Sequence, residues 1–301
     1  MATDLATLVG DRPTVGEAID RAAIALRLAG IEDGRVDAEW LLAETLGLGR
    51  GRLHVQARQT LETDDVARYV SVLSRRVARE PLQHIMGREG FRGLTVRVSA
   101  DALVPRPETE LLAGWALELL TPTPRPLVID VGTGSGCIAC ALAAERPDAR
   151  VLALDLSPAA ASLARANAEA LGLGARVSVH VGDLFTALAP GVRADVIVSN
   201  PPYLPSGLIP TLAAEVSRHD PRLALDGGDD GLAIMRRLVT DAPAHLTPGG
   251  WLVLETAGGE QIAAVETVMR HAGFVSIRTR PDLAGITRFV AGGRPPCQPV
   301  S

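Results

Sequence analysis

The sequence predicts an α/β protein in which a small helical domain precedes a parallel β-sheet covered by helices on both faces. Residues 14–80 place apolar side chains at helical spacing and contain no strand-like alternation. After residue 126, short apolar runs alternate with helical segments. This order is typical of right-handed crossovers between parallel strands, so we expect the sheet to lie between two helical layers.

The composition excludes several classes of chemistry. The chain has 301 residues, with 30 basic and 35 acidic side chains and a net charge of −5, and every basic residue is arginine. The absence of lysine excludes Schiff-base enzymes, pyridoxal-phosphate anchoring and Walker-type phosphate loops. The mild acidity argues against a large phosphate-binding surface, so no direct sequence-specific nucleic-acid contact is expected.

The chain carries no signal for a membrane or an oxidising compartment. It has no apolar run of about 18 residues, so no membrane span is expected. The N-terminal residues lack the charged-then-apolar order of a signal peptide. Three cysteines do not make a disulfide framework in a chain of this size. These features predict a cytoplasmic protein with no membrane partner.

Residues 1–85 are predicted to form the helical domain. Thr14 and Glu17 have the spacing of a capping box, and a helical apolar stripe follows from Val15. Further apolar residues at helical spacing occupy 38–46 and 66–77. Glycine or aspartate breaks separate these helices.

Residues 86–126 are predicted to connect the two domains. Within them, residues 91–98 alternate apolar and polar, as a half-exposed strand does. Pro105 and Pro107 then lead into a helix at 108–120, and a proline-rich link from Pro122 to Pro126 closes the connector.

Residues 127–291 are predicted to form the sheet domain, and residues 292–301, with three prolines, a disordered tail. Helices are expected at 137–145, 158–171 and 231–245. The apolar runs expected to be strands are 127–131, 151–154, 177–181, 196–199, 251–255, 275–278 and 288–291. In such sheets ligands bind at the carboxyl ends of the strands.

The first run ends in a glycine loop, Gly132-Thr133-Gly134-Ser135-Gly136, that opens a helix. Glycine allows the backbone to approach a ligand closely, and Asp155 at the end of the next run can accept both hydroxyls of a ribose. Together they predict a site for a nucleoside-containing cofactor, although a plain tight turn would also explain the glycines. A dinucleotide fingerprint would need glycine where Cys137 stands.

Two residues after the third run are candidates for the adenine pocket. Asp183 can accept a hydrogen bond from an adenine amino group, and Leu184 can pack against the ring. Asp183 alone is equally well explained as a helix N-cap.

The fourth run ends in Asn200-Pro201-Pro202-Tyr203, and asparagine occurs at only one other position, Asn167. The Asn200 side-chain carbonyl and the Pro201 carbonyl can jointly accept the two hydrogens of a planar –NH₂ group. Consecutive prolines fix φ and offer no competing N–H donor, and Tyr203 offers a flat face. An Asn-Pro turn is the alternative. At the carboxyl end of a strand, the pattern favours catalytic and substrate-binding roles.

No metal site is predicted. Cys137 and Cys140 match a C-x-x-C pattern, but a zinc site needs two further ligands and the redox use needs a different context. They are expected to pack as small apolar residues. Residues 226–231 resemble a calcium loop but lack its spacing, which favours a turn.

Arginines at 75, 76 and 79 form a basic strip on the helical domain. Such strips are usually solvated faces. The alternative is a surface for an acidic or RNA-associated partner.

Five segments, in this order, resemble the release factor glutamine methyltransferases (the HemK/PrmC family), over roughly residues 15–291. Pro-Arg-Pro-Glu-Thr-Glu at 105–110 combined with Asn-Pro-Pro-Tyr is highly specific, whereas Asn-Pro-Pro-Tyr alone also occurs in adenine-N6 DNA methyltransferases. The segments are 80–87, 105–110, 132–136, 200–203 and 223–228.

The resemblance implies a seven-stranded, Rossmann-like S-adenosylmethionine-dependent methyltransferase domain behind a helical domain that docks the protein substrate. It implies methyl transfer from S-adenosyl-L-methionine to the side-chain amide nitrogen (N5) of the glutamine in the Gly-Gly-Gln motif of peptide chain release factors. By position, 132–136 would hold the methionine end of the cofactor, Asp155 the ribose and Leu184 the adenine. Residues 200–203 would grip the target amide.

Residues 255–261 depart from the family pattern, because this segment is one residue longer than usual. Two other functions stay open at this point. An adenine-N6 nucleic-acid methyltransferase would need a basic groove and a recognition domain, and a non-catalytic binding module would keep the fold as a scaffold.

Overall fold

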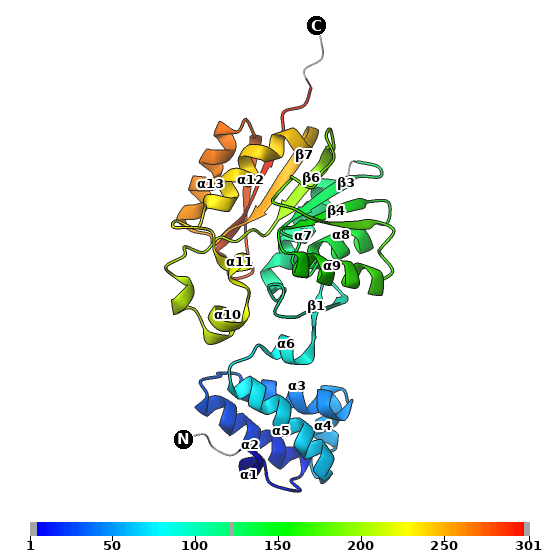
Figure 1. The fold of residues 1–301 in the computed structure, drawn as a ribbon, viewed down its shortest axis with the longest axis vertical. Helices are drawn as coiled ribbons and strands as arrows, with labels where there is room; N and C mark the ends of the chain where they lie inside the picture. The colour runs from blue at the N-terminus through cyan, green and yellow to red at the C-terminus, as the bar shows by residue number, and fades with distance from the viewer. Residues whose placement is uncertain (1–4, 121–122, 298–301) are drawn as a thin grey trace. The chain divides into compact units, whose positions relative to one another are not determined.

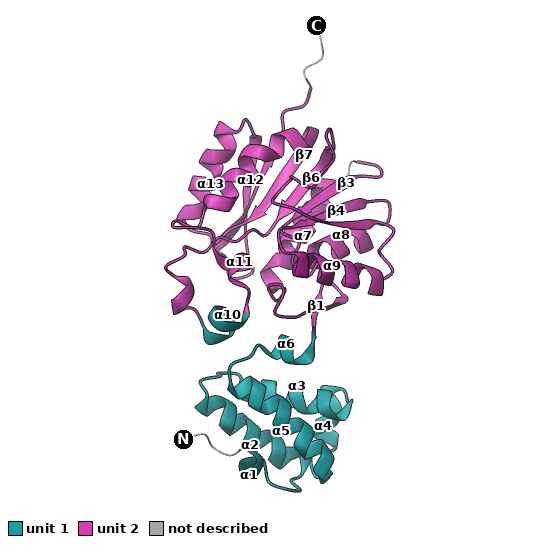
Figure 2. Cartoon of the chain, viewed as in Figure 1, with its two compact units in different colours: residues 1–87, 213–219 teal, residues 88–212, 220–301 magenta. Residues whose placement is uncertain are grey.

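The computed structural model describes residues 5–120 and 123–297. The chain divides into two compact units (Figure 2). The helical unit contains residues 1–87 and 213–219, and the sheet unit contains residues 88–212 and 220–301. Of the residues expected to be a connector, 86–126, all from Arg88 onward therefore belong to the same compact unit as the sheet. Pro122 and the last four residues of the expected tail lie outside the described residues.

The helical unit is built on amphipathic helices whose apolar faces meet in one core. Tyr69 is fully buried there, and its hydroxyl donates to the Ala38 carbonyl at 3.0 Å. The predicted capping box is confirmed, since Glu17 N–H donates to Thr14 Oγ1 and Thr14 N–H donates to a Glu17 carboxylate oxygen. Its helices are α1 (Leu5–Val9), α2 (Val15–Leu28), α3 (Gly34–Leu46), α4 (Arg50–Val55), α5 (Thr63–Val77), α6 (Leu82–Met86) and α10 (Ala214–His219).

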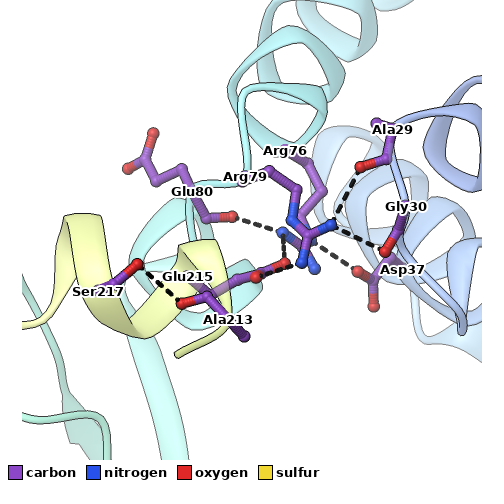
Figure 3. Close-up of polar contacts among 9 residues, drawn as sticks. All are labelled: Ala29, Gly30, Asp37, Arg76, Arg79, Glu80, Ala213, Glu215 and Ser217. Atoms are coloured by element: carbon purple, nitrogen blue, oxygen red, sulfur yellow. Dashed lines mark hydrogen bonds and ion pairs between the residues drawn. The ribbon is translucent and has the colours of Figure 1, made fainter. Parts of the chain in front are cut away.

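Helix α10 is held to the helical unit by ion pairs among buried and half-buried side chains (Figure 3). Arg76 lies between two carboxylates, with its Nε 2.7 Å from Asp37 and its Nη1 2.9 Å from Glu215. Arg79 Nη2 donates to the other oxygen of Glu215 at 2.6 Å. Burial alone would raise the pKa of Glu215, but the bonds from Arg79 and Arg76 lower it.

The expectation of a solvated basic strip is therefore wrong for Arg76, which is only 7% exposed. Its neighbour Arg75 pairs with Glu80 at 2.6 Å. The sequence pattern could not reveal this arrangement because Glu215 is 139 positions from Arg76.

We predict that Glu215→Ala releases α10 from the helical unit. A helix of six residues is too short to be stable alone, so its amide hydrogens should exchange much faster in the variant. Hydrogen exchange followed by mass spectrometry measures this, with the strands of the sheet unit as the internal control. Unchanged exchange in residues 214–219 would contradict the role of the ion pairs.

The sheet unit begins with a two-stranded hairpin where a single strand over 91–98 was expected. Strand β1 (Arg88–Phe91) pairs antiparallel with β2 (Leu94–Arg97). Arg92 and Gly93 make the turn with φ values of 47° and 76°. Positive φ at both central residues suits the twist of a two-residue hairpin, and this is what ends the strand at Phe91.

All seven apolar runs are strands of one sheet, with the order β5-β4-β3-β6-β7-β9-β8. The expectation of an all-parallel sheet is wrong at one edge, since β9 is antiparallel to both β7 and β8. A five-residue connection, 282–286, folds β8 back on β9 as a hairpin, which reverses the chain without a helix. The strands are β3 (Leu127–Val131), β4 (Arg150–Asp155), β5 (Val177–Val181), β6 (Ala194–Ser199), β7 (Leu246–Glu255), β8 (Val275–Pro281) and β9 (Thr287–Gly293).

Helices cover both faces of this sheet, as predicted (Figure 1). Helices α7, α8 and α9 enclose one apolar cluster against it, and α12 and α13 enclose another on the opposite face. The helices of the sheet unit are α7 (Pro107–Leu120), α8 (Cys137–Glu145), α9 (Pro158–Ala170), α11 (Arg222–Leu225), α12 (Ala233–Asp241) and α13 (Glu260–His271), with 3₁₀ turns at Ile209–Thr211 and Ala242–His245.

The last strand is longer than predicted. Gly292 and Gly293, assigned from the sequence to the tail, belong to β9, where they pair with Leu252 and Trp251 of β7. A Cβ on Gly292 would stand only 3.1 Å from the Cβ of Phe274. Glycine is therefore explained here by close packing, and not by disorder.

Asn167 on α9 joins the hairpin to the glycine loop. Its side chain is 1% exposed. It accepts a bond from Arg97 N–H at 2.8 Å and donates to the carbonyls of Arg97 and Ser135 at 2.9 and 2.8 Å. One buried amide thus satisfies three backbone groups of two separate segments.

We predict that Asn167→Leu destabilises the sheet unit by about 3 kcal/mol, because it removes the partner of the buried Ser135 carbonyl and of two partly buried backbone groups of Arg97. Urea denaturation measures the change, with Glu169→Ala on the exposed face of α9 as the control, expected within about 0.5 kcal/mol of the unaltered protein. Equal stabilities of the two variants would contradict the bridging role.

Candidate functional site

The carboxyl ends of β3, β4, β5 and β6 open onto one cavity of about 190 Å³. The cavity brings together nearly all the residues that the sequence singled out. They are Gly132, Thr133, Gly134, Ser135, Asp155, Asp183, Leu184, Asn200, Pro201 and Pro202. Gly136 and Tyr203 are the two candidates that do not line it.

The three glycines of the loop are explained by backbone conformation. Gly132, Gly134 and Gly136 have φ values of 70°, 56° and 79°, a region that side chains disfavour. A Cβ on Gly136 would also stand 3.0 Å from the Cβ of Ala164 on α9. Gly136 therefore lets the loop pack against a helix, whereas the first two glycines keep the wall of the cavity open.

Most backbone N–H groups of this loop have acceptors within the fold. Gly132 and Thr133 donate to the Leu154 carbonyl at 2.8 and 2.9 Å, and Gly134 donates to Asp155 Oδ2 at 2.8 Å. Gly136 donates to the Thr133 carbonyl. These four N–H groups are therefore already used within the fold, and close approach of the loop backbone to a ligand stays a prediction.

Asp130 is a buried residue behind the glycine loop that the sequence analysis missed, because it lies inside an apolar run. Its Oδ2 accepts from Thr133 Oγ1 at 2.6 Å and from Ala139 N–H at 3.2 Å. Burial raises the pKa of Asp130 to about 7. The Asp130 carboxyl thus links β3 to the first turn of α8 and fixes the start of the glycine loop.

Asp155 stands at the end of β4 and is held by backbone donors on both oxygens. Gly134 N–H and Ser157 N–H each lie 2.8 Å from the carboxylate. Burial raises the pKa of Asp155, and the bonds from Ser157 and Gly134 oppose the shift. Leu156 N–H is a third backbone donor to this carboxylate. A carboxylate has about four acceptor positions, so acceptor capacity remains for a hydroxyl donor from the cavity.

Asp183 and Leu184 lie on the cavity wall beyond β5. Asp183 pairs with Arg237 at 2.7 Å. The N-cap alternative is wrong, because no helix begins in the described chain between β5 and β6. Leu184 takes a φ of 50°, which turns the chain at this point.

Asn200 follows β6 and is held by two residues to which the sequence analysis gave no role. Asn200 Nδ2 donates to Thr109 Oγ1 at 3.1 Å, and Thr109 Oγ1 donates to Glu255 Oε2 at 2.9 Å. Thr109 belongs to α7 and Glu255 ends β7. The only signals for them were the Pro-Arg-Pro-Glu-Thr-Glu segment and the segment 255–261.

Tyr203 packs away from the cavity, against the apolar cluster under α12 and α13. Burial raises the pKa of its hydroxyl to about 12. Its backbone carbonyl accepts from Gln261 Nε2 at 2.8 Å, and a Cβ on Gly231 would stand 2.3 Å from the same oxygen. Gln261, which lies in the first turn of α13 and ends the atypical segment 255–261, thus fastens the Asn-Pro-Pro-Tyr segment.

The remaining sequence signals do not form further sites. Cys137 and Cys140 are buried on α8 within an apolar cluster, and burial raises the pKa of each thiol to about 12, which confirms that they pack as small apolar residues. Among the described residues no cluster could hold a metal ion. Over those same residues, no helix combines the length and the apolarity needed to span a bilayer.

Two family models match the chain. One, described as the PrmC N-terminal domain, matches residues 17–87. The other, described as the methyltransferase small domain, matches residues 110–215.

A solved structure of low sequence similarity shares the fold. The catalytic domain of hMettl16 in complex with a MAT2A 3′UTR hairpin is 19% identical, with a TM-score of 0.57, over 76% of this chain and 84% of that chain.

Curated relatives cover nearly the whole chain. The release factor glutamine methyltransferase of Caulobacter vibrioides is 39% identical over 95% of this chain and 98% of its own length. That of Burkholderia pseudomallei is 44% identical over 91% of this chain and 96% of its own length. With this identity along both chains, together with the two matching domains, the chain belongs to the release factor glutamine methyltransferase family.

Proposed function

We propose that this chain transfers a methyl group from S-adenosyl-L-methionine to the side-chain amide nitrogen (N5) of the glutamine in the Gly-Gly-Gln motif of peptide chain release factors. The observation that carries the proposal is the position of Asn200, which lines the same cavity as the glycine loop and Asp155. Family membership supports the substrate class, since the relatives are named release factor glutamine methyltransferases.

The residues around the cavity suit the cofactor by shape and by chemistry. The open wall at Gly132 and Gly134 would accommodate its methionine end, and the remaining acceptor capacity of Asp155 would take the ribose hydroxyls. Leu184 would pack on the adenine, with Asp183 as an acceptor for its amino group. When bound, S-adenosylmethionine supplies an electrophilic methyl group, so the protein has mainly to align the nucleophile. No metal is assigned to the reaction.

The target amide needs activation because its nitrogen lone pair is shared with its carbonyl group. Hydrogen bonds from its two N–H groups to Asn200 Oδ1 and the Pro201 carbonyl would raise electron density on the nitrogen and fix its orientation. Pro202 would keep the segment rigid, and Tyr203 would support it from the apolar cluster. No side chain is assigned as a general base, since the nitrogen becomes strongly acidic once methylated and can release its proton to water.

The helical domain, residues 1–85, is proposed to dock the release factor, and translation termination would place the protein in the cytoplasm. The direct test is mass spectrometry of a release factor incubated with the protein and S-adenosylmethionine. A mass gain of one methyl group on the Gly-Gly-Gln peptide is expected. Methylation of duplex DNA or RNA in parallel reactions, with none on the release factor, would favour the nucleic-acid alternative.

We predict that Asn200→Ala lowers turnover by at least about 100-fold, because the side-chain acceptor for the target amide is lost. Affinity for S-adenosylmethionine, measured by calorimetry, should fall only moderately. Thr211→Ala, an exposed position on the connection that follows, is the matched control and should retain full turnover. Near-normal turnover of Asn200→Ala would refute the assignment.

We predict that Asp155→Ala weakens binding of S-adenosylmethionine at least about tenfold, because two charge-assisted hydrogen bonds to the ribose are lost. Asp183→Ala should weaken it less, because Arg237 already pairs with that carboxylate. Calorimetric titration of both variants with S-adenosylmethionine compares the two losses of affinity. A larger loss in Asp183→Ala than in Asp155→Ala would contradict the assignment of Asp155 as the main cofactor-binding carboxylate.

A further inference from the structure

The orientation of the Asn200 amide decides whether it can accept a hydrogen bond from a substrate. A primary amide has a donor end and an acceptor end of nearly the same shape, and a half-turn about its last bond exchanges them. Only one of the two orientations directs the carbonyl oxygen away from Thr109. The surroundings of Asn200 must therefore select this orientation.

The chain of hydrogen bonds behind Asn200 has a fixed direction. Thr109 and Glu255 are 3% and 2% exposed, so water does not compete for their bonds. An ionised carboxylate can only accept, so the single hydroxyl hydrogen of Thr109 is committed to Glu255 Oε2 at 2.9 Å. The Thr109 oxygen then offers only lone pairs toward Asn200, and the Nδ2 of Asn200 occupies that position at 3.1 Å.

We propose that Glu255, acting through Thr109, is a positioning residue that holds the Asn200 amide with its carbonyl oxygen toward the substrate. The inference rests on the proposed function, because it specifies the orientation that gripping an –NH₂ group requires. A flipped Asn200 would place its oxygen against lone pairs of Thr109 and its own –NH₂ group against that of the substrate.

The charge of Glu255 controls the direction of the hydrogen bonds that join Glu255, Thr109 and Asn200. Burial raises the pKa of Glu255 to about 7, and Glu108 on α7 adds to the increase, whereas bonds from Thr109 and Asn200 and the charge of Arg288 on β9 oppose it. The Tyr203 hydroxyl also faces this carboxyl. Once protonated, Glu255 can donate to Thr109, whose hydrogen is then free to point at Asn200. The flipped amide becomes favourable in that state.

The pH dependences of activity and stability should therefore have opposite signs for this group. Because the folded state raises the pKa of Glu255, its contribution to stability is present below the unfolded-state pKa and is lost as the pH rises through about 7. Orientation of Asn200 needs the ionised form, so turnover should rise over the same interval. A residue that only supported the fold would change both quantities in the same direction.

Asparagine-selective ¹⁵N labelling gives a readout that needs no substrate, because the chain contains only Asn167 and Asn200. The Asn200→Ala variant identifies which side-chain signal belongs to Asn200. On titration from pH 5.5 to 8.5, the Asn200 –NH₂ signals should shift with a midpoint near 7, while those of Asn167 serve as the reference. The shift should disappear in Glu255→Gln. An Asn200 signal that does not titrate, or titrates equally in Glu255→Gln, would overturn the proposal.

Kinetics with a release factor substrate provide the second readout. Glu255→Gln should lower kcat about 10- to 100-fold at pH 8, with little change in cofactor affinity, and should remove the rise through pH 7. Thr109→Val removes the bridging hydroxyl without touching the carboxyl but leaves the direct bond from Asn200 to Glu255, so it should lower kcat in the same direction by a smaller factor, whereas Thr109→Ser should restore turnover. If Glu255→Gln does not fold, the valine and serine variants decide the question, and equal activity of these two would refute the proposal.

The two proposals fail in different ways. If the unaltered protein does not methylate a release factor, the proposed function is wrong, and the titration of Asn200 still decides whether Glu255 orients it. If the release factor is methylated but the variants keep the pH profile of the unaltered protein, only the role of Glu255 is wrong.

Discussion

The parallel pairing of β4, β3 and β6 is the constraint on which the site depends. Because neighbouring parallel strands end at the same edge of a sheet, the glycine loop, Asp155 and Asn200 meet there although they are far apart in the sequence. The backbone bonds from Gly132 and Thr133 to the Leu154 carbonyl extend this pairing beyond the strands. The loop and the carboxylate are therefore held together before any ligand arrives, which lowers the ordering cost of binding.

Much of this arrangement could be predicted because it is encoded locally. Each strand is a short apolar run, and the glycine loop follows the first of them directly. What a run does not encode is its direction and its neighbour, so the insertion of β9 between β7 and β8 was missed. Gly292 and Gly293 were assigned to the tail because their packing, against Phe274 and Trp251 respectively, depends on residues of other segments.

Apart from Asp130, which lies inside an apolar run, the residues that sequence reasoning missed are those whose partners are distant in the chain. Thr109 and Glu255 are 146 positions apart, and each alone has the character of an ordinary helix or strand residue. Asn167 had no evident role until the hairpin and the glycine loop were placed on either side of its amide. Asparagine occurs at only these two described positions, 167 and 200, and this rarity was the one feature of the composition that pointed to them. Asn167 uses both the donor and the acceptor of its amide, and the role proposed for Asn200 would do the same.

The docking of α10 onto the helical unit also affects the order in which the protein can fold. Residues 1–87 leave the ribosome first, yet Glu215, which binds Arg76 and Arg79, is synthesised more than 120 residues later. Until then Arg76 has only Asp37 as a carboxylate partner in the network described above, so the N-terminal helices can collapse early but reach their final charge balance late. Completion of the helical unit is thus tied to synthesis of the segment that follows Asn-Pro-Pro-Tyr.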